Sequence, residues 1–394
     1  MEQWLKRAWA EIDLDALVYN ARSIESRLTG GSRILAIVKA DGYGHGAVEV
    51  ARTLARCGVG YFGVSNLEEA IQLRRAGITE PVLILSHTPP EEAGRLLEFG
   101  ITQTVLSAEH GEMLSRAAVQ AGGRVKVHLK VDTGMTRVGF LYQDPERDRV
   151  SITDMAEICR LPGLEPEGIF THFAVSDEPD GEAFTREQFS RFMRAVRELE
   201  ERGIAFRYRH CCNSAATIRF PEMHLDLVRP GLILYGLMPA PWMNGMLPLR
   251  PLMALKSKVA MVKTVPAGVT VSYGRQYTTT RDTRLATVSI GYADGYSRRL
   301  SGRGYMLVQG QRAPVVGRVC MDQCMLDVSG IPEVKADTTV TAFGRDGDAV
   351  LPVEEFAAWS DTINYEAVCE IGKRVTRVYL RDGEVVGQLN YLVP

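Results

Sequence analysis

The chain has 394 residues, with 46 Lys and Arg against 48 Asp and Glu, so its net charge is −2. A balanced charge argues against nucleic acid as the main partner, because phosphate binding needs a basic face. Hydrophobic residues make up 45% and charged residues 24%, which are ordinary globular values and exclude disorder over the whole chain. The length suggests two or three domains, or one barrel of ~250 residues with a smaller module.

No apolar run reaches the roughly 18 residues of a membrane-spanning helix. The first residues, MEQWLKRAWAEIDLDAL, carry charges where a signal peptide needs an apolar stretch. The seven cysteines are odd in number and irregularly spaced, and a chain of this size needs no disulfides. We therefore predict a cytoplasmic protein. Cys320 and Cys324 have no second pair at zinc-finger spacing, so we expect no metal site.

Residues 33–236 alternate between short β-branched runs and longer stretches with helical spacing. Such runs, bounded by turn residues, are typical of buried strands. Their alternation with helical stretches predicts strand–helix units. The eight runs are RILAIVK (33–39), GVGYFGVS (58–65), PVLILS (81–86), TQTVLS (102–107), RVKVHLKV (124–131), GIFTHF (168–173), FRYRHCC (206–212) and LDLVRPGLILYG (225–236).

The stretches between these runs have the pattern of amphipathic helices. In REQFSRFMRAVRELEERG (186–203), apolar residues recur at spacings of three and four, which places them on one helix face. Gly77, Gly100 and Gly203 close three such stretches, as C-terminal caps do. Eight units favour a (β/α)8 TIM barrel over an open doubly wound sheet. No strand is followed by GxGxxG, which weakens the dinucleotide-binding alternative.

The composition changes near Met238, where MPAPWMNGMLPLRP reads as a linker with four prolines and one glycine. Beyond it, short alternating runs with turn signals predict a mostly β domain, with a hairpin at Asp382-Gly383 and one helix at 352–360. The predicted fold is α/β plus β. The N-terminal barrel takes residues 1–240 and the β-rich domain takes 241–394, with the first ~10 residues free to pack on the β domain.

Lys39 closes the first barrel strand and is followed by Ala-Asp-Gly-Tyr-Gly-His-Gly. A lysine at the mouth of a barrel is partly desolvated, which lowers its pKa and makes the amine nucleophilic. Such a lysine can form a Schiff base with an aldehyde cofactor. The glycines at 42, 44 and 46 would let the backbone approach a ligand. A solvated lysine beside a glycine-rich turn remains the alternative.

Strands seven and eight point to a phosphate. Strand seven ends in Asn213-Ser214, and strand eight carries Arg229-Pro230-Gly231. The loops after these two strands are where TIM barrels usually bind phosphate. The Ser214 hydroxyl and the amides near Gly231 suit phosphate oxygens, and Tyr43 could reach them from the first loop. A phosphate together with a reactive lysine suggests pyridoxal phosphate.

Nine segments in order through both predicted domains resemble the alanine racemase family. They are WAEIDLDAL (9–17), IVKADGYGHG (37–46), LKVDTGMTRVG (129–139), IFTHFAVSDE (169–178), CNSAAT (212–217), RPGLILYG (229–236), VSYG (271–274), VGRVCMDQ (316–323) and INYE (363–366). The resemblance implies a pyridoxal 5′-phosphate enzyme with a barrel, a C-terminal β domain and a head-to-tail homodimer with shared active sites. It also implies interconversion of L- and D-alanine, which supplies D-alanine to cell-wall peptidoglycan.

The resemblance also assigns roles in catalysis. Lys39 is the residue that forms the aldimine with the cofactor, and it serves as a base on one face of the substrate. Tyr273 in VSYG is the base on the other face. A free tyrosine has a pKa of about 10, so cationic neighbours must lower it or share its proton. The family implies that His172 and Arg229 do so. Arg229 also faces the ring nitrogen, to which it offers a hydrogen bond but no acid group.

Further positions follow from the same resemblance. Arg137 takes the substrate carboxylate, and Lys130 is the lysine that many relatives carry as a carbamate, with a plain Lys–Asp pair as the alternative. Met321, through its backbone, and Asp322 lie near the substrate. Tyr365 stands at the inner gate beside the cofactor and keeps the pocket small, which favours alanine over serine. An added hydroxyl changes binding by only ~1–3 kcal/mol, so some serine activity is expected.

Three rival functions stay open at this point. An amino-acid decarboxylase of the same architecture usually presents an acid to the ring nitrogen, and Arg229 argues against it. A broad-specificity or serine racemase differs only in its pocket. A non-catalytic pyridoxal-phosphate carrier resembles a barrel alone, so the long second domain argues against it. The remaining histidines show no metal spacing; His45 sits near the cofactor edge, and the others are taken as structural or solvated: His87, His110, His128, His210 and His224.

Overall fold

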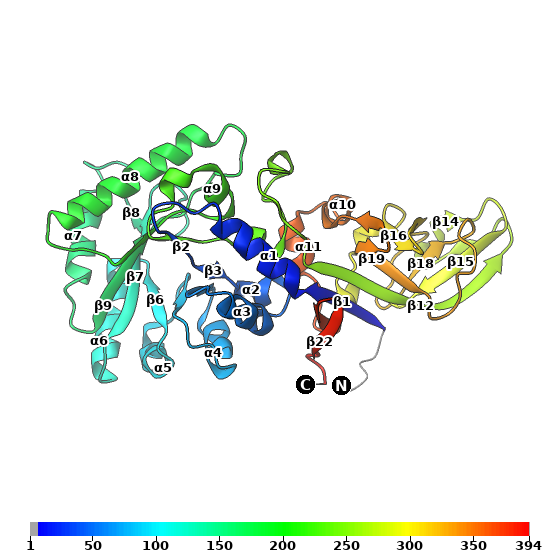
Figure 1. Ribbon diagram of the computed structural model, residues 1–394, viewed down its shortest axis with the longest axis horizontal. Coiled ribbons are helices and arrows are strands. Elements are labelled where there is room, and N and C mark those ends of the chain that lie inside the picture. The colour runs from blue at the N-terminus through cyan, green and yellow to red at the C-terminus, as the bar shows by residue number, and fades with distance from the viewer. Residues whose placement is uncertain (1–6, 394) are drawn as a thin grey trace. The chain divides into compact units, whose positions relative to one another are not determined.

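The computed structural model describes residues 7–393 of the chain (Figure 1). The chain forms two compact units. The barrel unit comprises residues 17–42 and 47–250, and the β unit comprises the described residues up to Ala16, Tyr43–Gly46 and the chain from Pro251 onward. None of the helices within the described residues is long and apolar enough to cross a membrane.

The barrel unit contains eight parallel strand positions that close into a ring. Seven strands form one sheet in the order β3-β4-β5-β6-β7-β9-β10. β11 closes the ring: it pairs with β2, and the Arg229 amide donates to the Cys212 carbonyl beyond β10 (2.9 Å). The predicted barrel is therefore confirmed. The strands are β2 (Arg33–Ile34), β3 (Ala36–Ile37), β4 (Phe62–Val64), β5 (Val82–Ile84), β6 (Thr102–Val105), β7 (Val125–Asp132), β9 (Leu164–Phe170), β10 (Tyr208–His210) and β11 (Leu227–Val228), with the short β8 (Phe140–Leu141) beside β7.

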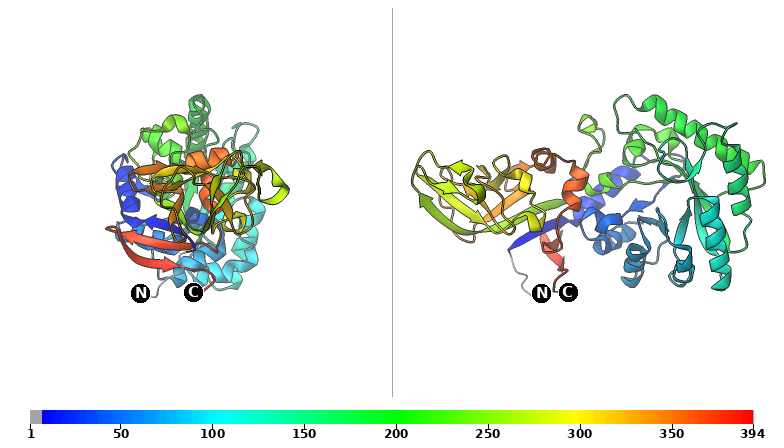
Figure 2. Two further views of the ribbon diagram at one scale, coloured as in Figure 1. Left: turned by 90° about the vertical axis from the view of Figure 1, so that its right-hand side faces the viewer. Right: turned by 180° about the vertical axis from the view of Figure 1, so that it is seen from behind.

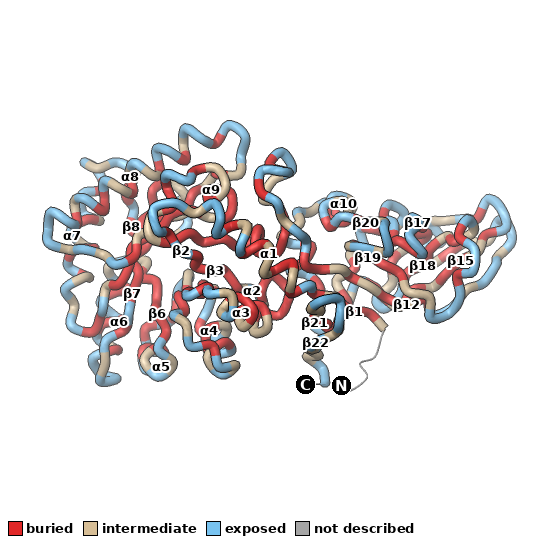
Figure 3. Tube along the Cα trace, in the orientation of Figure 1, coloured by how far each residue is buried: buried red, intermediate tan, exposed pale blue. Residues whose placement is uncertain are grey.

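Helices follow the barrel strands and expose their outer faces, while the strands are buried (Figure 3). In α8, Phe192, Val196 and Leu199 are buried, as their spacing predicts. The helices are α1 (Leu14–Glu25), α3 (Ala47–Arg56), α4 (Leu67–Arg75), α5 (Ala93–Glu98), α6 (Ala108–Gln120), α7 (Arg149–Ile158), α8 (Glu182–Glu200) and α9 (Ser214–Arg219).

The three glycine caps are confirmed. Gly77, Gly100 and Gly203 all have positive φ, at 86°, 58° and 77°. After Gly77, the amide of Ile78 returns to the carbonyl of Leu73 (3.1 Å), and equivalent bonds follow the other two glycines. This pattern is the Schellman motif, which satisfies the last carbonyls of a helix and turns the chain toward the next strand.

The eighth predicted strand is shorter than its apolar run. It ends at Val228, and Leu232–Tyr235 form a 3-10 helix rather than a continuation of the strand. All four residues of that helix are buried, so the run shows no alternation that could separate strand from helix. The 3-10 helix brings the Tyr235 hydroxyl to the Ile37 carbonyl, to which it donates (2.9 Å).

The β unit is built on a sheet with the order β17-β16-β19-β12-β1-β21-β22, and Figure 2 shows its strands from two further sides. β15 pairs with β12 and β18, and β20 pairs with β19. The strands are β1 (Ala8–Asp13), β12 (Met253–Val265), β13 (Thr270–Val271), β14 (Tyr277–Thr278), β15 (Thr283–Val288), β16 (Tyr305–Val308), β17 (Gln311–Pro314), β18 (Cys324–Asp327), β19 (Thr339–Asp346), β20 (Ala349–Leu351), β21 (Thr376–Arg381) and β22 (Glu384–Leu389).

The helices and the hairpin of the β unit can be compared with those predicted from the sequence. The predicted helix at 352–360 is confirmed as α10 (Val353–Trp359), and the predicted hairpin joins β21 to β22. A second helix, α11 (Asn364–Cys369), carries Tyr365 and was not predicted. β1 lies inside the sheet, antiparallel to β12 and parallel to β21.

Candidate active site

The predicted site residues of the barrel unit gather where its strands end. Lys39 follows β3, Lys130 lies near the end of β7, His172 follows β9 and Arg229 follows β11. Burial holds the pKa of His172 well below its ordinary value, and four neighbouring basic side chains lower it further: Arg229, Lys130, Arg137 and Lys39. The imidazole is therefore neutral, and this barrel mouth favours an anionic ligand.

Lys39 opens a strained turn, α2 (Lys39–Tyr43). Ala40, Asp41 and Gly42 have φ angles of 51°, 55° and 60°, and Tyr43 follows with 52°. The left-handed conformation costs roughly 1–2 kcal/mol for each residue that has a Cβ. Strain of this kind persists only where surrounding contacts fix the backbone, and it clusters at functional sites.

Two carboxylates of the barrel unit fix this turn. Glu69 in α4 accepts hydrogen bonds from the amides of Ala40 (2.8 Å) and Ser65 (2.7 Å), so it ties together the segments that follow β3 and β4. Asp41 accepts from the amide of Ala47 (3.0 Å) at the start of α3. Hydrogen bonds to charged groups are among the stronger ones, and they offset part of the strain.

Arg229 is 4% exposed and is fixed by several acceptors. Its Nη2 donates to the carbonyls of Thr171 (2.7 Å) and Cys211 (3.0 Å), and its Nη1 lies 2.8 Å from Nδ1 of His210. The guanidinium also lies 5.2 Å from the centre of the Phe170 ring. Burial lowers the pKa of Arg229 to about 10, so the group stays protonated at neutral pH.

His172 is held from two sides. Its Nδ1 lies 3.4 Å from Nη2 of Arg229. Its carbonyl accepts from the side-chain amide of Gln188 in α8 (3.1 Å), which also donates to the Thr133 hydroxyl (3.3 Å) and accepts from the Ala174 amide (2.9 Å). Gln188 thus joins the segments that follow β7 and β9, a role that no sequence pattern indicated.

Arg137 is presented by a loop that Asp132 holds in place. The Asp132 carboxylate accepts from the amides of Gly134, Thr136 and Arg137, each at 3.0 Å. Gly134 and Thr136 have positive φ, so the loop turns sharply. The Arg137 side chain is exposed, and its guanidinium has no hydrogen-bond or ion-pair partner among residues 7–393. It is therefore available to a carboxylate from outside the chain.

Lys130 is buried, and its amine has no hydrogen-bond partner within the described residues. Burial, and then the charge of Arg229, holds the pKa of Lys130 well below its ordinary value. The amine lies 4.9 Å from the centre of the Phe170 ring. No carboxylate within residues 7–393 makes an ion pair with it, so the plain Lys–Asp pair is not found. A neutral, unpaired amine is chemically reactive.

Asn213, Ser214 and Gly231 join the ends of the last two barrel strands. The Asn213 side chain caps α9 by accepting from the Ala216 amide (3.0 Å). The Ser214 hydroxyl accepts from the Gly231 amide (2.9 Å). The hydroxyl and the amides of these turns thus lie together, as a phosphate site at the end of a barrel requires.

In the β unit, Tyr273 lies on a turn between β13 and β14. Ser272 before it and Gly274 after it have φ angles of 64° and 72°. The Ser272 hydroxyl donates to the Arg318 carbonyl (2.6 Å). The Tyr273 side chain is 69% exposed within this chain. It lines a groove of about 690 Å³ together with Ser272, Cys320, Met321 and Asp322.

Met321 and Asp322 lie on the exposed turn Cys320–Gln323. The Met321 carbonyl accepts from the Ala293 amide (3.0 Å). The Asp322 carboxylate accepts from Nη2 of Arg374 (2.7 Å). The backbone of one residue and the side chain of the other are therefore both fixed within the β unit.

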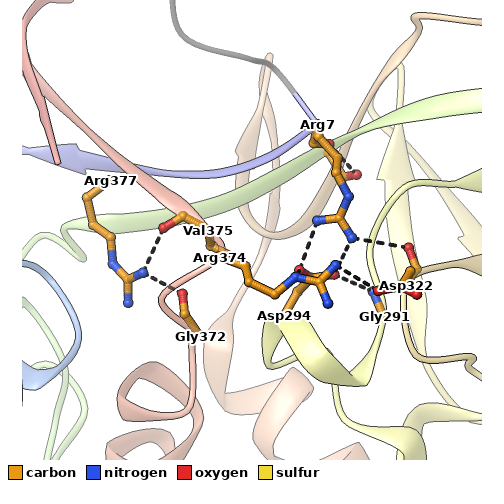
Figure 4. A network of polar contacts seen from close by, with 9 residues as sticks. Arg7, Gly291, Asp294, Asp322, Gly372, Arg374, Val375 and Arg377 are labelled. Carbon is orange, nitrogen blue, oxygen red and sulfur yellow. Dashed lines mark hydrogen bonds and ion pairs between the residues drawn. The ribbon is translucent and has the colours of Figure 1, made fainter. Parts of the chain in front are cut away.

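A buried carboxylate supports this turn. Asp294 is fully buried and lies between two guanidiniums (Figure 4). It accepts two hydrogen bonds from Arg7 (2.9 and 2.8 Å), and its Oδ1 lies 3.3 Å from Nε of Arg374. Arg374 thus links Asp294 to Asp322, a connection that the sequence did not indicate.

Tyr43 and Tyr365 approach one another in the β unit, with ring centres 6.5 Å apart. Burial raises the pKa of Tyr43, so its hydroxyl keeps its proton and can donate. The glycines beside Tyr43 lie against other parts of the chain. A Cβ on Gly44 would lie 2.2 Å from the Val368 carbonyl, and one on Gly46 would lie 1.9 Å from the Tyr379 hydroxyl. Both glycines thus make room for neighbouring protein atoms.

The candidate residues therefore form two groups. The barrel unit holds Lys39, Lys130, Arg137, His172, Asn213, Ser214, Arg229 and Gly231, and the β unit holds Tyr43, Tyr273, Met321, Asp322 and Tyr365. Within residues 7–393, no cluster of three or more His, Cys, Asp or Glu side chains could bind a metal ion.

Family models for both domains match the chain. The alanine racemase N-terminal domain matches residues 12–239, and the alanine racemase C-terminal domain matches residues 252–379. The chain belongs to the alanine racemase family. The alanine racemase of Desulforamulus reducens is 49% identical over 373 residues, which is 94% of this chain and 98% of that protein. That of Desulfovibrio desulfuricans is 51% identical over 372 residues, with the same coverage.

A solved structure agrees with the family assignment. The alanine racemase of Clostridium difficile 630 has a TM-score of 0.94 and 39% identity, covering 99% of this chain and 100% of that one. The resemblance predicted from the nine segments is thus confirmed, and so is the pairing of a barrel with a β-rich domain.

Proposed function

We propose that the protein interconverts L-alanine and D-alanine with pyridoxal 5′-phosphate as cofactor, and so supplies D-alanine for cell-wall peptidoglycan in the cytoplasm. Family membership makes the chain a pyridoxal-phosphate-dependent amino-acid racemase, which is an isomerase. The observation that carries the proposal is the position of Lys39, whose charge acts on His172 together with that of Arg229 at the end of the barrel strands.

The chemistry of the barrel mouth fits this cofactor. No carboxylate among residues 7–393 forms an ion pair with Lys130, Arg137 or Arg229, so these basic side chains can accommodate an anion from outside the chain. A phosphorylated aldehyde would supply the anion, and its aldehyde carbon can bond to the amine of Lys39. The phosphate would be bound by the Ser214 hydroxyl, which can donate its own proton while it accepts from the Gly231 amide, with Asn213 holding the turn. Tyr43, His172, Arg229 and Tyr365 complete the binding residues by family resemblance.

Two bases on opposite faces account for racemisation. When bound, the cofactor accepts the electron pair that remains on the substrate Cα after its proton is removed. Lys39 exchanges a proton on the D-alanine face, and Tyr273 does so on the L-alanine face. Arg137 binds the substrate carboxylate, because its guanidinium is exposed and has no acceptor within the described chain. Met321 and Asp322 border the substrate.

A homodimer with shared active sites follows from the state of Tyr273. Tyr273 is 69% exposed and lines a groove formed by the β unit, so its side chain is open to a second copy of the chain. We infer that a second copy of this chain covers the groove and brings its own barrel cations to Tyr273. No nucleic acid or membrane takes part in this proposal.

Lys130 is proposed to carry a carbamate. Its unprotonated amine attacks the carbon of CO2, the new N–C bond forms, and the nitrogen loses one proton to solvent. The product is an anion near Arg137 where a neutral amine stood before. We expect a carbamate carbon signal in 13C NMR after exchange with labelled bicarbonate, and its loss in Lys130→Arg. The same signal in both proteins would show that the modified lysine is another one.

The proposed function is tested by circular-dichroism racemisation assays across a panel of L-amino acids. We expect alanine to react fastest and serine measurably, because Tyr365 narrows the pocket without excluding a hydroxyl. Comparable rates for many amino acids would instead indicate a broad-specificity racemase. Tight binding of the cofactor without exchange of the Cα hydrogen for deuterium would indicate a carrier.

A further inference from the structure

The interior of the barrel contains a line of hydrogen-bonded side chains that begins at Arg229. Nη1 of Arg229 lies 2.8 Å from Nδ1 of His210, and Nε2 of His210 lies 2.8 Å from Nδ1 of His128. Nε2 of His128 lies 3.2 Å from the hydroxyl of Tyr61. All four side chains are buried. The proposed racemisation uses Arg229 and leaves the other three without a role.

The proton positions in this line are fixed by the chemistry of arginine. A guanidinium only donates hydrogen bonds, so Nδ1 of His210 must accept, and the proton of His210 lies on Nε2. That proton is donated to Nδ1 of His128, whose own proton then lies on Nε2 and points at the oxygen of Tyr61. Every hydrogen bond therefore points away from Arg229.

Both imidazoles are held neutral and fixed in orientation. Burial and the charge of Arg229 hold the pKa of His210 well below its ordinary value and lower that of His128 to about 3. The ring of Phe170 stacks on His210 with centres 4.7 Å apart. A Cβ on Gly168 would lie 2.6 Å from the ring of His128, so this glycine makes the space in which that ring lies.

The line ends at Tyr61, just before β4, near the carboxylate of Glu167 on β9. The charge of Glu167 in β9 raises the pKa of Tyr61, after burial has done so. Glu167 is largely buried, and its carboxylate lies 3.7 Å from the amine of Lys126. Tyr61 also lines a cavity of about 220 Å³ with Arg33, which begins β2, and Tyr208. A cation at one end and an anion at the other favour the same direction of hydrogen bonding.

We propose that His210, His128, Tyr61 and Glu167 form a positioning relay that couples the far end of the barrel to Arg229. Hydrogen bonds in a low-dielectric interior polarise one another along a chain. The anion near Tyr61 makes His210 a better acceptor and leaves Arg229 a firmly held cation, less able to give up a proton to the ring nitrogen of the cofactor. This inference rests on the proposed function, because it concerns how cleanly the reaction returns a proton to Cα.

The first test observes the relay without measuring activity. Solid-state 15N NMR of the holoenzyme labelled at histidine should show one protonated and one unprotonated nitrogen in both His210 and His128, with no titration across pH ~5–8. Tyr61→Phe, which keeps the ring, should shift the Nε2 resonance of His128. A protonated Nδ1 in His210, or a doubly protonated ring, would overturn the relay even if the protein racemises alanine.

The second test measures the coupling. Glu167→Gln should raise the ratio of transamination to racemisation about tenfold, with little change in KM for alanine, and Glu167→Asp should restore most of the native ratio. Glu165→Gln is the matched control, because Glu165 is an exposed carboxylate on the same strand. Equal ratios in Glu167→Gln, Tyr61→Phe and the control would refute the coupling. A native protein without racemase activity would refute the proposed function, while the NMR result would still decide the relay.

Discussion

The turn after Lys39 and the turn that carries Tyr273 share a strained backbone but are held differently. Ala40–Tyr43 are all left-handed, and the carboxylates of Glu69 and Asp41 bind the turn to two neighbouring segments. Ser272 and Gly274 also have positive φ, but the acceptors that hold that turn are neutral: Ser272 bonds the Arg318 carbonyl and Cys320, and Arg275 donates to the Thr270 hydroxyl. Its tyrosine is mostly exposed.

This difference indicates whether each candidate base has its final surroundings within one chain or acquires them from a second chain. A strained backbone keeps its geometry only where contacts over-determine it. The lysine turn has such contacts within its own unit, so we expect Lys39 to be positioned for the cofactor in a single chain. Within residues 7–393, no carboxylate accepts a hydrogen bond from the tyrosine turn, and we expect it to acquire its final environment when a second chain covers the groove.

Lys39→Ala tests the lysine turn of the barrel unit and should have the largest effect on activity. Racemisation should fall in both directions by more than ~10⁴-fold, because both the covalent attachment and one base are lost. Borohydride should no longer fix the cofactor to the chain, as measured by mass spectrometry. Lys335→Ala, at an exposed lysine of the β unit, should leave both unchanged. A reducible cofactor bond in Lys39→Ala at native activity would contradict the assignment.

Tyr273→Phe tests the tyrosine turn of the β unit. It should impair proton exchange on one face of the substrate only. The hydroxyl is removed and the ring remains, so exchange of the Cα hydrogen for solvent deuterium should persist from D-alanine and fall ~10²–10⁴-fold from L-alanine. Tyr277→Phe, on the same hairpin, is the control. Equal loss from both enantiomers would rule out the two-face assignment.

Mixing the inactive Lys39→Ala and Tyr273→Phe chains tests whether Tyr273 serves the barrel of its own chain or that of its partner. If Tyr273 serves the partner's barrel, a heterodimer of Lys39→Ala and Tyr273→Phe chains has one site with both bases. Part of the native activity should then return. Verified heterodimers without activity would exclude the shared site and leave Tyr273 to its own chain.

Asp294→Asn probes what supports the exposed turn of the β unit. Arg7 and Arg374 would lose their buried anion, which should lower the free energy of unfolding by about 3 kcal/mol in urea denaturation. KM for alanine should rise, since Arg374 also positions Asp322. Asp361→Asn breaks an exposed pair with Arg303 and should cost less than about 1 kcal/mol. Equal losses of stability in the two variants would show that burial of Asp294 is not decisive.

Glu69→Ala should produce the smallest of these effects, confined to the lysine turn. Two amides lose a charged acceptor, so we expect a loss of about 2 kcal/mol in unfolding free energy and a lower kcat with cofactor attachment retained. Glu68→Ala, at an exposed neighbour in the same helix, controls for the charge near the helix N-terminus. If both variants retain native stability, the strained turn is fixed by other contacts.

Much of the fold could be predicted because its signals are local. The run MALKSKVAMVKTV coincides with β12, and glycines at helix ends coincide with Schellman motifs. The 3-10 helix at 232–235 was missed because a fully buried apolar run has no period. The left-handed turn and its partner Glu69 were missed because backbone conformation there depends on a carboxylate remote in sequence. Lys39, Ser214 and Gly231 could be proposed as site residues from their places at the ends of barrel strands, whereas Tyr273, Arg137 and Lys130 were proposed only through the family resemblance.

The place of β1 has a consequence for how the protein is made. In the sheet, Trp9 lies opposite Lys256 on one side and Thr376 on the other. β1 is therefore synthesised before the barrel unit, and its two partners, β12 and β21, only after it. Closing so long a loop is slow. A fragment that starts at Pro251 would lack an interior strand of its own sheet, so we expect the β unit to assemble only from a chain that includes β1.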